Sequence, residues 1–246
     1  MVCLICDGSY RGLLSALFDA HAMKPPPEEV FLLPPKQPQL LAQYINVPTD
    51  EDKAARVERA IREKLSPTAI GHVEMLAASA VPEAGTLLFR YLKLGWKVGK
   101  SLDDHLVMPE VMDVIQLARR VGKEINKFSG LVRFFTLDSG VLYAELEPDH
   151  DIVPLLAPHF VNRMPAENWV LHDTAHGTAA LYRPGECRIV RGAFDASQVR
   201  KDDEFLELWR AFYDAIGIKE RVSEKRRRAF MPKRYWKHLP EVNPKL

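Results

Sequence analysis

The chain has 246 residues, of which 47% are apolar and 27% are charged, and its 34 Lys and Arg residues nearly balance 33 Asp and Glu residues. This length suits one large domain or two small ones, and the composition is that of a globular protein with a sizeable core. No apolar run approaches the roughly 20 residues that span a bilayer. The N-terminus lacks the basic flank and long apolar region of a signal peptide, so we predict neither a membrane span nor a leader.

The chain contains only three cysteines, Cys3, Cys6 and Cys187. This number does not support a disulfide framework and favours a cytoplasmic location. Cys3 and Cys6 have CxxC spacing, but they lie in the apolar run VCLIC, which predicts a strand. Residues three apart on a strand point to opposite faces, and no second cysteine pair supplies the remaining ligands of a zinc site. We therefore predict structural cysteines, no metal and no cofactor.

Residues 1–48 predict a short α/β segment followed by a connector. A strand over Val2–Ile5 leads through the turn DGS into a helix from about Arg11 to Met23. The run KPPPEEVFLLPPKQP then places six prolines in fifteen residues. Proline opposes helix and removes backbone donors, so we expect a wrapped connector with one short strand at Val30–Leu33.

Residues 49–129 predict a helical block. Thr49 and Asp50 cap a helix to about Leu65, a second helix follows Pro67, and a third runs from about Pro82 to Trp96. The longest helix begins near Pro109. Its apolar residues recur at three- and four-residue steps: Val111, Val114, Ile115, Ala118, Val121, Ile125 and Phe128.

Residues 130–218 predict a sheet unit. The run LVRFFTLDSGVLYAELEP has the pattern of a hairpin, NWVLHD and TAALYRP form a second strand pair, and CRIV is a possible fifth strand. Asp151 is expected to cap a helix to about Arg163, with Pro154 in its first turn, and a last helix covers Asp202–Ile216. We predict an α+β fold, in which the helical block packs against a mostly antiparallel ββαββ-type sheet unit.

Residues 219–246 form a basic C-terminal tail. Residues 219–237 contain nine Lys and Arg residues but only two acids. This segment therefore carries a local charge of about +7, although the net charge of the whole chain is +1. Cations neutralise phosphates, and aromatic rings among them stack on exposed bases. The alternative is a solvated tail whose rings dock on the protein. The candidate nucleic-acid contacts are Lys225, Arg226, Arg227, Arg228, Lys233, Arg234, Tyr235 and Trp236.

Two helices carry basic stripes that favour the same interpretation, although each alone is typical of a solvated face. The third predicted helix and the longest one each place cations at three- and four-residue steps. We expect these faces to assist the tail, the tail to supply most of the affinity, and its removal to leave the fold intact. The stripes consist of Arg90, Lys93, Lys97 and Lys100, and of Arg119, Lys123 and Lys127.

The run YAELEPDHDIVPLLAPHF contains the acids and histidines that are the main candidates for a catalytic site. On a strand, Glu145 and Glu147 share one face with Tyr143, and we expect them to be exposed or paired with a cation such as Arg133 or Arg163. A carboxylate–imidazole site for general acid–base work is one hypothesis. The simpler alternative is that the acids organise a turn and a cap while the histidine packs. The candidates are Glu145, Glu147, Asp149, His150 and His159.

Several signatures are absent from the sequence. GxGxxG, GxxxxGK[ST], GxSxG and HExxH do not occur, which excludes the common dinucleotide, P-loop, esterase and zincin classes. A three-cysteine iron–sulfur signature is also missing, so the chain is not itself a radical SAM enzyme.

Five runs carry a family resemblance: CDGSYRGLLSALFDA, LFRYLKLGWK, VIQLARRVGKE, VRFFTLDSGVLYAELEPDHDIVPLLAPHF and FMPKRYWKHLPE. Through them, nearly the whole chain resembles a bacterial family described as DNA-repair or DNA-metabolism proteins that contain a domain of unknown function. Members are typically encoded beside a radical SAM protein, and some also carry a uracil-DNA-glycosylase-type domain, which this chain lacks. The resemblance implies DNA and a radical SAM partner but no reaction.

These observations together predict a DNA-binding component of a repair or modification system. An enzyme that acts on a nucleic acid or nucleotide through the acidic and histidine residues is the first alternative. A protein–protein adaptor whose tail binds an acidic partner is the second.

Overall fold

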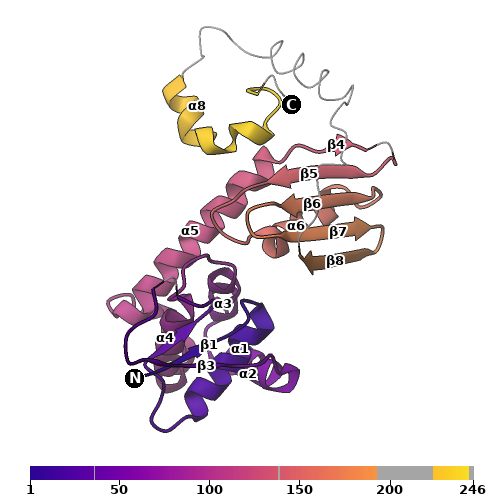
Figure 1. The fold of residues 1–246 in the computed structure, drawn as a ribbon. Coiled ribbons are helices and arrows are strands. Elements are labelled where there is room, and N and C mark those ends of the chain that lie inside the picture. Colours follow the sequence, from indigo (N-terminus) through magenta and orange to yellow (C-terminus); the bar gives the residue numbers. More distant parts are fainter. Residues whose placement is uncertain (36, 138, 193–223, 244–246) are drawn as a thin grey trace. The chain divides into compact units, whose positions relative to one another are not determined.

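The computed structural model describes residues 1–35, 37–137, 139–192 and 224–243, so the predicted helix Asp202–Ile216 lies outside the described residues. The chain forms two compact units, Met1–Gly122 and Lys123–Leu246, whose elements are labelled in Figure 1. Helices and sheets occur together, which confirms the α+β class. Within the described ranges, no helix is both long and apolar enough to cross a membrane.

The N-terminal unit contains a three-stranded parallel sheet. β1 (Val2–Ile5) lies in its centre, between β2 (Glu29–Phe31) and β3 (Gln43–Asn46). Helix α1 (Tyr10–Ala22) forms the crossover from β1 to β2. The proline-rich segment and the residues after it therefore supply both flanking strands, of which only β2 was predicted.

The side chains of β1 alternate between the two faces of this sheet. Leu4 and Cys6 belong to the main helical core, whereas Cys3 and Ile5 pack with Phe31 on the other face. The prediction that the two cysteines point to opposite faces is confirmed. Burial raises the pKa of the Cys6 thiol above its ordinary value, as expected for an inert core cysteine.

Helices cover one face of the parallel sheet. The cap of the second helix is as predicted, because the carboxylate of Asp50 accepts a hydrogen bond from the Lys53 amide at 3.0 Å. Six of the seven residues in the apolar stripe of the longest helix are likewise buried, and Ile125 is half-buried. The elements are α2 (Glu51–Lys64), α3 (Ala69–Ala77), α4 (Ala84–Val98), the 3₁₀ helix η1 (Gly99–Asp104) and α5 (Pro109–Leu131).

Gly85 allows the first turn of α4 to approach β2 closely. A Cβ atom at Gly85 would collide with the carbonyl oxygen of Val30, while Thr86 exchanges hydrogen bonds of 2.9 and 3.1 Å with the backbone of Val30. We expect Gly85→Ala to destabilise the protein by about 1–3 kcal/mol through this overpacking. Gly71→Ala is the control, since nothing lies within 4 Å of a Cβ there, and it should stabilise α3 by roughly 0.5–1 kcal/mol. Urea unfolding of both variants measures the two effects, and equal shifts would contradict the close approach.

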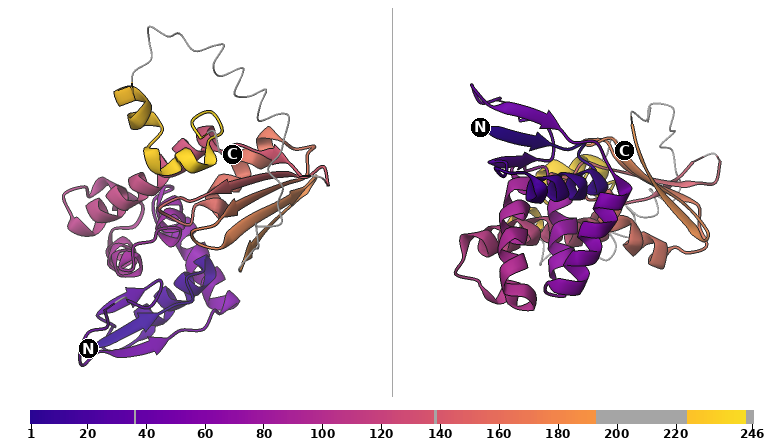
Figure 2. Two further views of the ribbon diagram at one scale, coloured as in Figure 1. Left: turned by 45° about the horizontal axis from the view of Figure 1, so that its top comes forward. Right: turned by 90° about the horizontal axis from the view of Figure 1, so that it is seen from below.

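The C-terminal unit contains a five-stranded sheet in the order β4-β5-β6-β7-β8. Its neighbours are antiparallel except β5 and β6, which run parallel and are joined by α6 (Val153–Arg163). Helix α6 packs on β6, β7 and β8, on one face of the sheet (Figure 2). The predicted hairpin, second strand pair and fifth strand are all present. The strands are β4 (Phe135–Thr136), β5 (Leu142–Leu146), β6 (Trp169–Asp173), β7 (Thr178–Arg183) and β8 (Glu186–Arg191).

The predicted cap of α6 is wrong. The residue before the helix is Ile152, which has no side chain able to cap it, although Pro154 does lie in the first turn. Asp151 instead directs its carboxylate to Arg191 at 2.8 Å, and burial raises its pKa above the ordinary value. A salt bridge to β8 has replaced the expected contact with the helix backbone.

The described part of the tail belongs to the C-terminal unit. It forms α8 (Glu224–Phe230) and the 3₁₀ helix η4 (Lys233–His238), which contacts β5. Tyr235 is 2% exposed, and its ring centroid lies 4.7 Å from that of Phe128. The tail therefore contributes a large side chain to the core of this unit.

Candidate functional site

The carboxyl ends of β5 and β6 lie at one edge of the five-stranded sheet, because these two strands are parallel. Glu147 and Asp149 follow β5, while Thr174 and His176 follow β6. We call this the carboxyl edge. Such an edge collects polar side chains from segments that are distant in sequence, and most candidate catalytic residues lie there or on the adjoining face of β5.

A buried carboxylate fixes the loop after β5. Glu124 of α5 is 6% exposed and accepts hydrogen bonds from the backbone amides of Asp149 at 2.7 Å and His150 at 3.0 Å. It also accepts one from the hydroxyl of Tyr235 at 3.0 Å. One side chain thus joins α5, the loop and the tail.

The polar face of β5 is covered rather than open. The Tyr143 hydroxyl lies 2.7 Å from Nδ1 of His172 and 3.4 Å from Oε1 of Glu145, and the tyrosine is 1% exposed. Burial, followed by the charge of Glu145, raises the pKa of Tyr143, and burial lowers the pKa of His172. A neutral phenol and a neutral imidazole are therefore favoured here at pH 7.

The tail places three basic side chains against these acids. Nδ1 of His238 lies 3.8 Å from Glu145, and its Nε2 lies 3.8 Å from Glu147. Lys237 forms an ion pair with Glu147, and Arg234 pairs with Asp149 at 2.5 Å. Tail residues are thus partners of both Glu145 and Glu147.

The pKa of Glu147 reflects these contacts. Burial by itself raises it, but hydrogen bonds from Lys237 and Thr174 outweigh burial and hold it below the ordinary value. The carboxylate is therefore ionised near neutral pH and acts as an acceptor or a base, not as an acid. Arg133, one of the partners expected from the sequence, donates a hydrogen bond to Glu241 of the tail at 2.8 Å.

A second acidic group organises the turn after β6. Asp173 is fully buried, and its Oδ1 accepts the backbone amides of Ala175 at 2.8 Å and His176 at 3.1 Å. Its other oxygen lies 2.7 Å from Nδ1 of His176, and this hydrogen bond raises the pKa of the histidine. These are the contacts of a structural turn. Among the described residues, no group of three or more His, Cys, Asp or Glu is arranged to hold a metal ion.

The structure brings four of the five candidate catalytic residues to the covered face of β5 or the loop after it. Glu145 and Glu147 face the tail, Asp149 pairs with it, and the main chain of His150 is held by Glu124. His159 lies apart, exposed on α6, with its ring edge against Phe160.

The candidate nucleic-acid residues differ in how far their side chains are exposed. Tyr235 is buried, and Trp236 is half-buried with its Nε1–H donating to the carbonyl of Met231 at 2.8 Å. Arg234 also stacks on Tyr235, 4.7 Å from the ring centroid. Arg227 and Lys127 are half-buried, and Arg226 belongs to α8. The exposed members are Arg90, Lys93, Lys97, Lys100, Arg119, Lys123, Lys225, Arg228 and Lys233.

Several residues of this site were not singled out from the sequence. Glu124 had a usable signal, because it occupies a position of the apolar stripe of α5, between Val121 and Phe128. A carboxylate at a buried helix position needs donors. His238 had no such signal, since only the fold brings the tail onto β5.

The chain was compared with known proteins. The family model of a domain of unknown function, DUF4130, matches residues 82–241. The match begins just before α4 and includes the five-stranded sheet, the carboxyl edge and the tail as far as Glu241. No curated protein matches the chain.

Proposed function

The chain belongs to the DUF4130 family, and on this premise we propose that it is a DNA-binding component of a DNA repair or modification system. It acts in the cytoplasm beside a radical SAM protein, the partner that its sequence resemblance implies. The free state of all three cysteines supports a reducing compartment.

The basic face of α4 carries this proposal. Arg90, Lys93, Lys97 and Lys100 are all exposed, and none has an ion pair within the described part of the chain. Some other cations of the N-terminal unit are paired, such as Lys53 with Asp19 at 2.7 Å. The predicted stripe is wrong at Lys100, because α4 ends at Val98 and Lys100 lies in η1. Three cations on one face of α4, with Lys100 just after them, leave an anionic partner to be supplied, and a phosphate backbone is such a partner.

The tail contributes less than its charge suggests. Arg234 and Lys237 already face carboxylates, so a phosphate would have to displace Asp149 and Glu147 to reach them. Lys225 and Lys233 are exposed. We therefore assign the main electrostatic contact to α4 and a supporting one to the outer surface of the tail.

A salt titration tests the proposal. Fluorescence anisotropy with duplex and single-stranded DNA at several salt concentrations is expected to show affinity that falls as salt rises. The quadruple variant Arg90→Gln, Lys93→Gln, Lys97→Gln, Lys100→Gln should reduce the duplex slope of log affinity against log salt by about 3–4, near 0.9 for each lost phosphate contact. Salt-independent binding, or an unchanged slope in the variant, contradicts the proposal. Binding to an acidic protein but not to DNA would support the adaptor alternative.

A second candidate function is catalysis on a nucleic acid or nucleotide at the face of β5. The observation that favours it is His238, whose two ring nitrogens each face a carboxylate, with Lys237 beside Glu147. Such a carboxylate–imidazole–carboxylate set relays protons once the groups close from 3.8 Å to hydrogen-bond distance. In a system reconstituted with the partner, Glu147→Gln should then abolish turnover while DNA affinity and melting temperature remain unchanged.

A further inference from the structure

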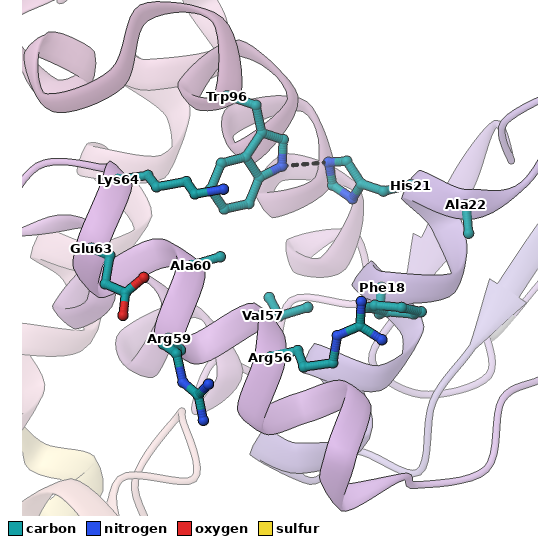
Figure 3. A pocket seen from close by; sticks show the side chains of 10 residues that line it. All are labelled: Phe18, His21, Ala22, Arg56, Val57, Arg59, Ala60, Glu63, Lys64 and Trp96. Carbon is teal, nitrogen blue, oxygen red and sulfur yellow. Dashed lines mark hydrogen bonds between the residues drawn. The ribbon is translucent and has the colours of Figure 1, made fainter.

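A pocket of about 520 Å³ opens in the N-terminal unit between α1, α2 and the C-terminal half of α4. Figure 3 shows its aromatic residues, Phe18, His21 and Trp96, around the same space as the side chains of α2. Neither the sequence patterns nor the family match drew attention to it. Its volume is within the range of small-ligand sites.

The aromatic wall of the pocket is held in place. Nδ1 of His21 lies 2.7 Å from the carbonyl of Leu17, and Trp96 donates its Nε1–H to Nε2 of His21 at 3.0 Å. The second contact requires a neutral ring with an unprotonated Nε2. Burial first, and then the charge of Lys93, lowers the pKa of His21 and favours this state. The indole is thus fixed by a hydrogen bond while remaining 37% exposed.

Cations line the opposite side. Arg56, Arg59 and Lys64 of α2 are exposed and have no ion pair among the residues that the structure describes, and Glu63 is the single acid in the lining. On the same helix, Arg62 pairs with Glu58 at 2.9 Å. The pocket therefore combines a net positive charge with an ordered, accessible aromatic surface.

The basic face of α4 adjoins the pocket. Lys93 is one helical turn before Trp96, and Lys97 follows Trp96 directly. The charge of Lys93 contributes to lowering the pKa of His21. A strand that follows the cations of α4 would pass the mouth of the pocket. A nucleotide consists of a planar base joined to a phosphate. In this pocket the base would stack on the aromatic ring, and the cations would bind the phosphate.

We infer that this pocket takes one unstacked nucleotide of a single-stranded nucleic acid, with the base against Trp96 and the phosphate at Arg59 and Lys64. This deepens the proposed function, on which it rests. A base inside a duplex is stacked on both faces and does not reach the indole, so the pocket makes the protein prefer single strands or locally opened DNA.

Two variants and a charge-matched control test the inference. Trp96→Ala should weaken binding to a labelled single-stranded oligonucleotide about tenfold and scarcely change its salt slope, because stacking carries no charge. Arg59→Gln with Lys64→Gln should instead reduce that slope by roughly 1–1.5, near 0.7 per phosphate. Arg120→Gln with Arg163→Gln removes the same charge from exposed sites elsewhere and should change neither quantity. Melting temperatures establish that each variant is folded.

The outcomes separate the pocket from the function on which it rests. If the wild-type protein binds no oligonucleotide, the proposed function fails. If it binds, but Trp96→Ala keeps full single-strand affinity or the pocket pair behaves like its control, only the pocket inference fails. A parallel titration with a deoxynucleoside monophosphate tests the alternative that the pocket binds a free nucleotide. Free nucleotide bound as tightly as the strand would overturn the assignment to a strand.

Discussion

Tyr235→Ala is expected to destabilise the C-terminal unit by about 3–5 kcal/mol, the usual cost of removing a large buried aromatic side chain. The ring is 2% exposed, packs on Phe128 and donates its hydroxyl to Glu124. Burial, and then the charge of Glu124, raises the pKa of the phenol, so the hydroxyl keeps its proton and remains a donor near neutral pH.

Phe230→Ala provides the matched control in the same tail. This ring is 72% exposed at the end of α8, so its removal should change the free energy of unfolding by no more than about 0.5 kcal/mol. Urea unfolding followed by far-UV circular dichroism measures both variants. Equal and small effects would mean that the tail does not dock as the structure shows.

The same contacts change what truncation would reveal. Leu239 is also buried, at 1% exposure. Deleting the tail removes both this side chain and Tyr235 from the core, and it uncovers Tyr143 and Glu145. The expectation that the tail can be removed without damage to the fold is therefore reversed. Point substitutions of exposed cations are the appropriate test of DNA binding.

Local patterns predicted most elements and two antiparallel strand pairs, but not the parallel pairings. The helical period of α5, the Asp50 cap and the DSG hairpin are short-range features, and each appears as expected. The strand β3 escaped prediction because it follows prolines and is only four residues long. Parallel pairing of β5 with β6 depends on the crossover through α6, which no local pattern specifies.

The sequence predicted several acidic residues of the site, but not which residues pair with them. Alternation on a strand correctly grouped Tyr143 with Glu145 and Glu147, since such spacing is geometric. The partner of Glu147 is Lys237, ninety residues later, and long-range pairs of this kind follow from tertiary packing alone. The basic tail was interpreted as a nucleic-acid surface because its charge is visible in the sequence, whereas the acids that neutralise part of it become neighbours only in the fold.

Glu124→Ala is expected to cost about 3–9 kcal/mol, because three donors lose their acceptor and each buried donor left unsatisfied costs roughly 1–3 kcal/mol. Those donors are the amides of Asp149 and His150 and the hydroxyl of Tyr235. Asn126→Ala, an exposed position two residues later on the same helix, is the control and should have a small effect.

A double-mutant cycle distinguishes this link from two independent packing sites. If Glu124 joins the loop after β5 to the tail, Tyr235→Phe should cost less in the Glu124→Ala background than in the wild type. The reason is that the tyrosine hydroxyl no longer has a charged acceptor to lose. A coupling energy of roughly 0.5–3 kcal/mol in unfolding experiments is expected for such a contact. Strict additivity would contradict it, and the tail would then be held by its apolar contacts and its other ion pairs. Protection of the Asp149 and His150 amides from hydrogen exchange gives an independent measurement, because both should lose protection in Glu124→Ala and retain it in Tyr235→Phe.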